Sequence, residues 1–281
     1  MLLIADSGST KTHWEFIHNG KVSSAYTDGI NPFYKSTEQI IADIRNELLP
    51  QINIEPERIF FYGAGISQPD KVEIVRRALL AVFPSAKAEV EHDLLAAARA
   101  TCGNAPGISC ILGTGSNSCL YDGKKIADNV PSLGFMLGDE GSGGYFGKKL
   151  LQAYYYRELP DDLKKLLETE YDMRKEQVLN EVYGSSTPNQ VVAAYADFVT
   201  EKNQHPFIRR ILENGFREFF ERFVFKYAGF KNLPVHFIGS IAVLNKEILH
   251  AVMDALKLSK GITLKSPMEG LVKYHVETVN Q

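Results

Sequence analysis

The chain has 281 residues, of which 44% are hydrophobic and 23% charged, and its formal net charge is −3. This length predicts one large or two medium domains, with a core that needs no disulfide or structural metal. The small negative charge excludes bulk attraction to nucleic acid or to an anionic membrane. Cys102, Cys110 and Cys119 form no CxxC pair, so we expect reduced thiols rather than a disulfide framework or a zinc site.

The first residues do not have the pattern of a targeting segment. Residues 1–6 lack a basic stretch, and their apolar run stops at Asp6, so we expect no signal peptide. No stretch approaches the roughly 20 apolar residues of a membrane span. We therefore expect a cytoplasmic protein without membrane contacts.

The first hundred residues predict an α/β layer domain in the order β-β-β-α-β-α-β-α. Alternation, apolar runs and an Asn-Gly hairpin signal predict the strands, and apolar residues at helical spacing predict the helices. The predicted strands are 2–5, 12–17, 21–27, 58–62 and 88–91, and the predicted helices are 36–49, 70–83 and 94–100.

The second half begins with the same order of elements. A strand over 107–112, a turn of small residues and a strand over 118–121 repeat the pattern of residues 2–17. A glycine-rich segment, helices over 148–227, a strand over 235–238 and a helix over 245–256 follow. This repetition predicts two similar halves with a cleft between them.

The turn over residues 6–12, Asp-Ser-Gly-Ser-Thr-Lys-Thr, is the first candidate phosphate site. Gly8 lets the backbone approach a ligand closely, and successive N–H groups in such a turn form an anion-binding concavity. Ser9, Thr10 and Thr12 add hydroxyl groups, and Lys11 adds a positive charge. Asp6, at the strand end, could hold Mg²⁺ directly or through water. An ordinary polar hairpin turn is the alternative.

Two further turns of small residues extend this pattern. Residues 113–117, Gly-Thr-Gly-Ser-Asn, again suit backbone wrapping around phosphate oxygens, and they repeat the first loop in the second half. Gly239-Ser240 lies between a predicted buried strand and a helix, where small residues would let adenine or ribose lie against the backbone. Plain hairpin and strand-to-helix turns are the alternatives.

Three sets of polar residues are candidates for binding and activating a substrate hydroxyl. Asp93 follows a strand and precedes an Ala-rich helix, so it is either a helix N-cap or a general base. Asp139-Glu140, between glycines, suits hydrogen bonding to sugar hydroxyls or a metal, and otherwise a solvated turn. Asn31-Pro32-Phe33 offers an amide and an aromatic face, or a loop with a core phenylalanine.

Taken together, these motifs resemble the N-acetylglucosamine kinase branch of the actin-like ATPase superfamily, in order and over nearly the whole chain. The resemblance rests on residues 6–12, on 113–117, on Met-Leu-Gly-Asp-Glu-Gly-Ser at 136–142 and on Gly239-Ser240-Ile241. The family's adenosine motif usually begins with two glycines, and its usual tryptophan is Phe33 here.

The resemblance implies a fold, cofactors and site residues. It implies two actin-like (ribonuclease H-like) domains with mixed sheets flanked by helices, at 1–102 plus 262–281 and at 103–261, with the active site in the interdomain cleft. It implies ATP with Mg²⁺ near Asp6, Asp93 as the base for the sugar 6-hydroxyl, and a homodimer. Phosphate ligands would be Gly8, Ser9, Thr10, Lys11, Thr12, Gly113, Thr114, Gly115, Ser116 and Asn117; adenosine ligands Gly239, Ser240 and Ile241; and sugar ligands Asn31, Asp93, Gly134, Asp139 and Gly143.

The first functional hypothesis is therefore phosphorylation of an amino sugar, N-acetylglucosamine before glucosamine or N-acetylmuramic acid. The second is an ATPase activator of a 2-hydroxyacyl-CoA dehydratase or benzoyl-CoA reductase system, whose relatives hold an iron–sulfur cluster between two subunits. The third is a sensor that binds sugar without turnover.

Overall fold

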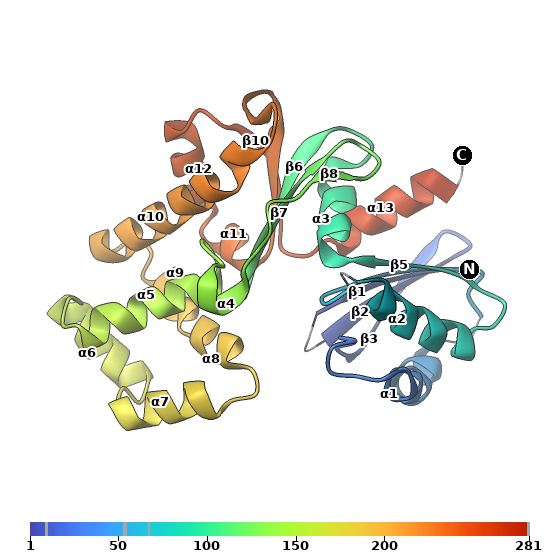
Figure 1. Ribbon diagram of the computed structural model, residues 1–281, viewed down its shortest axis with the longest axis horizontal. Coiled ribbons are helices and arrows are strands. Elements are labelled where there is room, and N and C mark those ends of the chain that lie inside the picture. The colour runs from blue at the N-terminus through green and yellow to red at the C-terminus, as the bar shows by residue number, and fades with distance from the viewer. Residues whose placement is uncertain (9–10, 53–54, 67, 280–281) are drawn as a thin grey trace. The chain divides into compact units, whose positions relative to one another are not determined.

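The computed structural model of the chain describes residues 1–8, 11–52, 55–66 and 68–279 (Figure 1). The chain forms two compact units. Unit 1 comprises Met1–Asn104 and Ser266–Gln281, and unit 2 comprises Ala105–Lys265.

Unit 1 contains a mixed five-stranded sheet in the order β3-β2-β1-β4-β5. Its strands β1, β2 and β3 form an antiparallel meander, whereas β1, β4 and β5 are parallel. The hairpin between β2 and β3 turns at Asn19 (φ 51°) and Gly20 (φ 75°), which confirms the Asn-Gly prediction. The bounds are β1 Leu2–Ser7, β2 Lys11–His18, β3 Lys21–Asp28, β4 Arg58–Gly63 and β5 Lys87–His92.

The two faces of this sheet differ in chemistry. One face is apolar and packs on α1 (Thr37–Asp43) and α2 (Pro69–Val82), with Trp14 and Phe61 at its centre. A capping box between Ser36 and Gln39 begins α1, which continues as π-helical and 3₁₀ turns to residue 51. The opposite face is covered by α3 (Asp93–Cys102) and α13 (Met268–Val279), which lie side by side (Figure 1).

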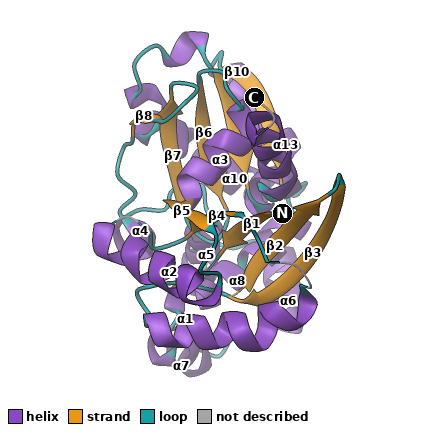
Figure 2. Ribbon diagram, turned by 90° about the vertical axis from the view of Figure 1, so that its right-hand side faces the viewer, coloured by secondary structure: helices purple, strands orange, loops and turns teal. Residues whose placement is uncertain are grey.

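Unit 2 contains a second mixed sheet, in the order β10-β9-β6-β7-β8, whose strands lie side by side in Figure 2. Strands β6, β7 and β8 are antiparallel, and β6, β9 and β10 are parallel. Each unit therefore places its first three strands and its last two in the same order. The repeat in the sequence predicted two similar halves from the first two strands of each. The bounds are β6 Gly107–Leu112, β7 Ser116–Tyr121, β8 Ile126–Asp128, β9 Pro234–Ile238 and β10 Ser259–Leu264.

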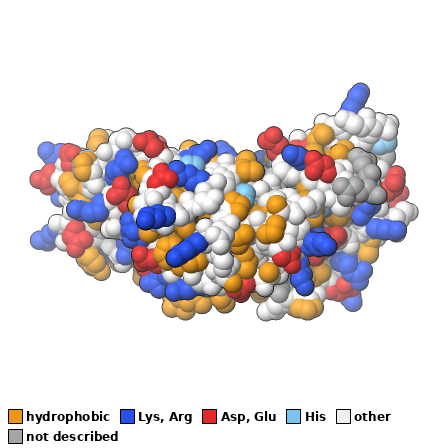
Figure 3. Space-filling view, turned by 90° about the horizontal axis from the view of Figure 1, so that it is seen from above, with side chains coloured by type: hydrophobic (Ala, Val, Ile, Leu, Met, Phe, Trp, Pro, Cys, Tyr) orange, Lys and Arg blue, Asp and Glu red, His pale blue; other side chains and the backbone are white. Residues whose placement is uncertain are grey.

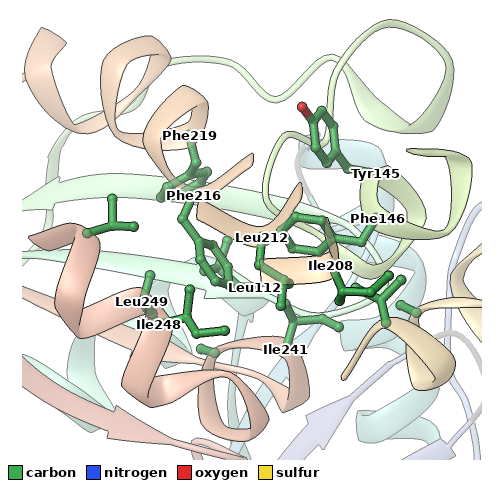
Figure 4. Packing of buried hydrophobic residues seen from close by; sticks show 14 of the residues in the cluster. Leu112, Tyr145, Phe146, Ile208, Leu212, Phe216, Phe219, Ile241, Ile248 and Leu249 are labelled. Atoms are coloured by element: carbon green, nitrogen blue, oxygen red, sulfur yellow. The ribbon is translucent and has the colours of Figure 1, made fainter. Parts of the chain in front are cut away.

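Helices of unit 2 enclose a large apolar core against this sheet. Phe216 and Leu212 point toward Phe146, and the rings of Phe146 and Phe216 are 5.2 Å apart (Figure 4). The helices are α4 Gly134–Leu137, α5 Gly143–Tyr155, α6 Asp161–Glu170, α7 Lys175–Gly184, α8 Pro188–Ala194, α9 Ala196–Glu201, α10 Pro206–Arg222, α11 Ser240–Leu244 and α12 Lys246–Ala255, with 3₁₀ turns at Val224–Lys226 and Phe230–Asn232.

The surface carries both signs of charge. On the face seen in Figure 3, acidic and basic side chains are interspersed, as expected for a net charge of −3. Within the described ranges, no helix combines the length and apolar character needed to cross a bilayer.

Candidate functional site

The candidate site of unit 1 lies at the carboxyl ends of its parallel strands, where open α/β sheets bind ligands. Asp6 is in β1, and it pairs in register with Tyr62 of β4, which pairs with Glu91 of β5. Asp93 follows β5 directly as the first residue of α3. Two carboxylates that the sequence singled out separately therefore belong to one edge of one sheet.

Asp6 and Asp93 are electrostatically unusual. Burial, and secondly the negative charge of Asp93, raises the pKa of Asp6 to about 7. Burial raises the pKa of Asp93 to about 6, although hydrogen bonds from the backbone N–H groups of Leu94 and of Asp93 itself lower it. Both residues are only partly exposed, and the surrounding protein removes much of the hydration of their carboxylates. Perturbed carboxylates with solvent access are typical of functional sites.

The donor set fits Mg²⁺ better than a metal held entirely by protein. Within the described part of the chain, no three His, Cys, Asp or Glu side chains form a metal cage. Among the described residues, no hydrogen bond lowers the pKa of Asp6. Mg²⁺ is usually held by one or two carboxylates together with water and phosphate oxygens, and a cation would favour the ionised form of Asp6.

The turn after β1 is fixed by hydroxyl groups. Ser7 Oγ lies 2.7 Å from Thr12 Oγ1 and accepts a hydrogen bond from the Ile30 N–H at 2.9 Å. The N–H of Gly8 donates to the Lys11 carbonyl at 3.0 Å, which closes the turn. Thr12 is fully buried, so its hydroxyl holds the turn rather than facing solvent.

Of the remaining residues of this loop, only Lys11 is described. The ammonium of Lys11 lies 3.6 Å from the centre of the Tyr26 ring. Ser9 and Thr10, both predicted phosphate ligands, lie outside the described residues. Sequence reasoning missed Ser7, whose hydroxyl at a strand end between Asp6 and Gly8 was the available signal.

Asn31 packs tightly against the turn that follows β4. Its Oδ1 accepts a hydrogen bond from the Phe33 N–H at 3.0 Å. A Cβ added at Gly65, whose φ is 78°, would lie 2.5 Å from this oxygen. Phe33 is 53% exposed beside it, and Lys71 Nζ lies 4.9 Å from the Phe33 ring centre. Gly65 is a second residue that the sequence did not identify as part of the site.

In unit 2, the second predicted phosphate loop is shorter than expected. Ser116 and Asn117 are the first residues of β7, so only residues 113–115 form the turn between strands. The Gly113 N–H donates to the Gly115 carbonyl at 3.0 Å. Thr114 is exposed at the tip, whereas the Ser116 side chain is buried.

Asp139 supports this loop directly. Its Oδ1 accepts hydrogen bonds from the Ser116 N–H at 3.3 Å and the Ser132 hydroxyl at 3.2 Å. A Cβ at Gly115 would lie 3.0 Å from Asp139 Oδ2, so a side chain there would press on the carboxylate. Burial raises the pKa of Asp139, whereas its two hydrogen bonds lower it.

The N-terminus of α5 binds the same loop. The N–H groups of Gly143 and Gly144 donate to the carbonyls of Gly113 and Thr114 at 2.8 and 2.9 Å. A Cβ at either glycine would lie 3.3 or 3.2 Å from those oxygens, which is tighter than most real contacts. Gly144 is therefore a further site residue that the sequence did not single out.

Gly239 packs against the start of this loop. Its φ is 124°, and a Cβ there would overlap the Leu112 carbonyl. Ser240 is exposed at the beginning of α11, whereas the Ile241 side chain belongs to the apolar core of unit 2. Three motifs far apart in sequence, at 113–117, 138–144 and 239–241, thus meet in unit 2.

The remaining residues of the glycine-rich segment take structural positions. Gly134 has φ 70°, and its N–H donates to Ser132 Oγ at 3.4 Å. Glu140 is buried and forms an ion pair with Arg222 at 3.2 Å. Ser132 links Gly134 to Asp139, so the segment is tied to the second loop through side chains.

Comparison with known proteins identifies the family. The chain matches no protein-family model and no curated protein. A solved structure of the putative N-acetylglucosamine kinase of Porphyromonas gingivalis is 40% identical, with a TM-score of 0.93 and 98% of each chain covered. The chain belongs to the N-acetylglucosamine kinase-like branch of the actin-like ATPase superfamily.

More distant structures share the fold of this kinase-like branch. The putative N-acetylglucosamine kinase of Chromobacterium violaceum is 16% identical, with a TM-score of 0.71 and coverage of 97% of this chain and 98% of that one. The ROK family glucokinase of Streptomyces griseus, solved with glucose and AMPPNP, is 14% identical, with a TM-score of 0.55 and 97% coverage of both chains. Both confirm two mixed sheets flanked by helices as the actin-like fold.

Proposed function

We propose that this protein is a sugar kinase that transfers the γ-phosphoryl group of ATP to a hydroxyl of an amino sugar. N-acetylglucosamine is the first candidate acceptor, with its 6-phosphate as product. The observation that carries the proposal is the pair Asp6 and Asp93, two carboxylates of raised pKa at one sheet edge. The 40% identity to a protein named as a putative N-acetylglucosamine kinase supports the choice of acceptor.

Each carboxylate has its own role in this proposal. Bound Mg-ATP supplies the phosphoryl group and neutralises the charge that develops on it. Asp93 orients the acceptor hydroxyl and takes its proton, which requires the ionised form. Asp6 holds Mg²⁺, directly or through water.

The glycine-rich turns position the phosphates in this proposal. The turn at Gly8 and the backbone N–H groups of Thr114 and Gly115 face the phosphate oxygens, since glycine permits close approach. Asp139 holds the second turn through Ser116, and this support leaves its Oδ2 for a sugar hydroxyl. Asn31, Gly134 and Gly143 complete the proposed sugar contacts, and Gly239, Ser240 and Ile241 the adenosine contacts.

An acidic amino sugar such as N-acetylmuramic acid is the second candidate acceptor. Lys71 favours it, because this ammonium lies 4.9 Å from the ring of the exposed Phe33, beside Asn31. The ion pair between Lys71 Nζ and Asp70 Oδ2 is long, at 3.5 Å, so it competes weakly with a bound carboxylate. A sugar carboxylate near Asn31 would gain a charge-assisted hydrogen bond that a neutral sugar lacks.

The ATPase-activator hypothesis receives less support. Cys110 and Cys119 are buried in β6 and β7, and both are fully enclosed. A cluster shared between subunits requires cysteines that reach a surface. Purified protein with stoichiometric iron and a brown colour would favour this function over the kinase.

A coupled assay of ADP release with N-acetylglucosamine, glucosamine and N-acetylmuramic acid tests the kinase proposal. Asp93→Asn should lower kcat by about 10²- to 10⁴-fold while sugar binding persists. Asp161→Asn is the matched control, because Asp161 is likewise the first residue of a helix. Sugar binding by the wild type without ADP release would instead indicate a sensor.

The proposal extends to assembly and location. We infer a cytoplasmic homodimer. An odd count of three cysteines with no CxxC pair fits a reducing compartment. Light scattering of the purified chain measures the assembly, and a monomeric mass would contradict the dimer.

A further inference from the structure

We propose that the hydroxyl of Tyr62 is a positioning group: through Arg99 and His275 it fixes α3, and with it Asp93, against β4, the strand that pairs with the one carrying Asp6. This inference rests on the proposed function, in which Asp93 is the base. It concerns the face of the first sheet that α3 and α13 cover.

The Tyr62 hydroxyl joins three elements in one buried network. Arg99 Nη1, from α3, donates to the hydroxyl oxygen at 2.6 Å and to Glu89 Oε1 of β5 at 2.6 Å. His275 Nε2, from α13, lies 2.8 Å from the same hydroxyl. Tyr62 is 1% exposed, so water does not replace these partners.

The direction of these hydrogen bonds follows from the chemistry of the groups. Arginine only donates, so the Tyr62 oxygen accepts from Arg99 and the hydroxyl proton remains to be donated to His275. Burial, with the charges of Arg99 and Arg58, lowers the pKa of His275 to about 3. The ring is therefore neutral and Nε2 can accept. His275 also stacks on Phe60, with ring centres 3.7 Å apart.

A second contact brings the backbones of α3 and α13 together. A Cβ at Gly270 of α13 would overlap the Ala100 carbonyl of α3, so the two backbones touch there. The Tyr62 network holds α3 near the same end of the helix, at Arg99. Asp93 lies at the opposite end, about 9 Å away along the axis.

Because α3 is held at Arg99 and carries Asp93 at its other end, a small tilt of the helix displaces Asp93. A tilt of α3 by about 6° would move Asp93 by about 1 Å. A displacement of about 1 Å in a reacting group can cost up to about 10²-fold in rate. Tyr62 also pairs in register with Asp6, so the anchor of α3 lies next to the other carboxylate of the site.

Tyr62→Phe tests the inference, because it removes the hydroxyl and keeps the ring. We expect kcat to fall about 5- to 50-fold while KM for ATP and for sugar changes less than about twofold. Amide hydrogen exchange in α3, measured without ligands, should rise about tenfold or more relative to α2. Tyr155→Phe is the control, since it removes a hydroxyl that donates to the Met173 carbonyl at 3.2 Å within unit 2.

The outcomes separate this inference from the proposed function. Unchanged kcat, or unchanged exchange in α3, overturns the positioning role of Tyr62. If the wild type phosphorylates no sugar, the kinase proposal fails, and the exchange measurement alone decides whether Tyr62 fixes α3. If Tyr62→Phe does not fold, Arg99→Lys is used instead, because it keeps the charge but cannot reach both Tyr62 and Glu89 with one planar group.

Discussion

The carboxylate of Asp139 accepts a hydrogen bond from the backbone N–H of Ser116 at 3.3 Å, across 23 residues of sequence. Asp139 has φ 62°, a left-handed conformation that aspartate and asparagine tolerate better than most residues. The side chain that the family resemblance assigned to the sugar is thus also a support for the predicted phosphate loop.

Asp139→Ala should weaken nucleotide binding and lower the free energy of unfolding by about 1–3 kcal/mol, because the Ser116 N–H loses its acceptor. Asp139→Asn should cost less, since an amide oxygen can still accept. Nucleotide titration and chemical denaturation measure both effects. Asp122→Ala is the control, because Asp122 accepts from the N–H groups of Lys124 and Lys125 in an exposed hairpin. Equal nucleotide affinity in all three variants would contradict this role.

The raised pKa of Asp6 predicts a pH-dependent stability. The folded pKa of about 7 exceeds the ordinary aspartate value of 3.8, so protonation stabilises the folded state. This contribution is fully present below pH 3.8 and is lost as the pH rises through 7. Relative to Asp6→Asn, the wild type should lose on the order of 2–4 kcal/mol of unfolding free energy between pH 4 and 8.

Magnesium should counteract this loss at pH 8, where Asp6 is ionised, and should have little effect at pH 5. Chemical denaturation of the wild type and of Asp6→Asn, with and without Mg²⁺, measures both terms. Asp28→Asn, at an exposed position of the same sheet, is the control. If Mg²⁺ changes the free energy of unfolding equally in the wild type and in Asp6→Asn, Asp6 is not a magnesium ligand.

Lys71→Met distinguishes the two candidate acceptors. If Lys71 binds a sugar carboxylate, KM for N-acetylmuramic acid should rise about 5- to 30-fold, as expected for a lost charged hydrogen bond. KM for N-acetylglucosamine should not change. Lys35→Met is the control, because Lys35 already pairs with Asp43 at 2.7 Å. A parallel rise for both sugars would count against charge recognition.

Gly147→Ala should destabilise unit 2 by about 3 kcal/mol or more, because the new methyl group would overlap the Val192 carbonyl where α5 meets α8. Gly184→Ala should change stability by less than about 1 kcal/mol, since no atom lies within 4 Å of its added Cβ. Thermal and chemical denaturation measure both variants. Similar losses in the two variants would contradict the packing argument, because alanine has the higher helix propensity at both positions.

The sequence predicted the elements well where their patterns are local. The order of elements in unit 1, the hairpin at Asn19-Gly20 and the long helices of unit 2 were all correct. Strand β10 was missed because it is a bulged edge strand whose burial does not alternate cleanly. At Gly261 the absence of a side chain makes room for His236, whose Nδ1 accepts from the Ile262 N–H at 3.0 Å, and no sequence period encodes this contact.

The candidate site was only partly predictable for a related reason. Glycine-rich spacing identified residues 113–117 and 138–143 as separate motifs, but their contact depends on tertiary packing. Gly65 illustrates the limit. Asn31 leaves no room for a side chain at position 65, yet Asn31 lies more than thirty residues earlier and reaches this position only in the folded unit.

The helix α13 belongs to unit 1 but follows all of unit 2 in the chain. During synthesis, therefore, the ribosome completes unit 2 before it releases the segment that covers Phe60 and supplies His275 to Tyr62. Until then, one face of the first sheet is covered by α3 alone, and nascent unit 1 is expected to be the more exposed of the two to chaperones and proteases. The emergence of α13 thus determines when the sheet that carries Asp6 acquires its final environment.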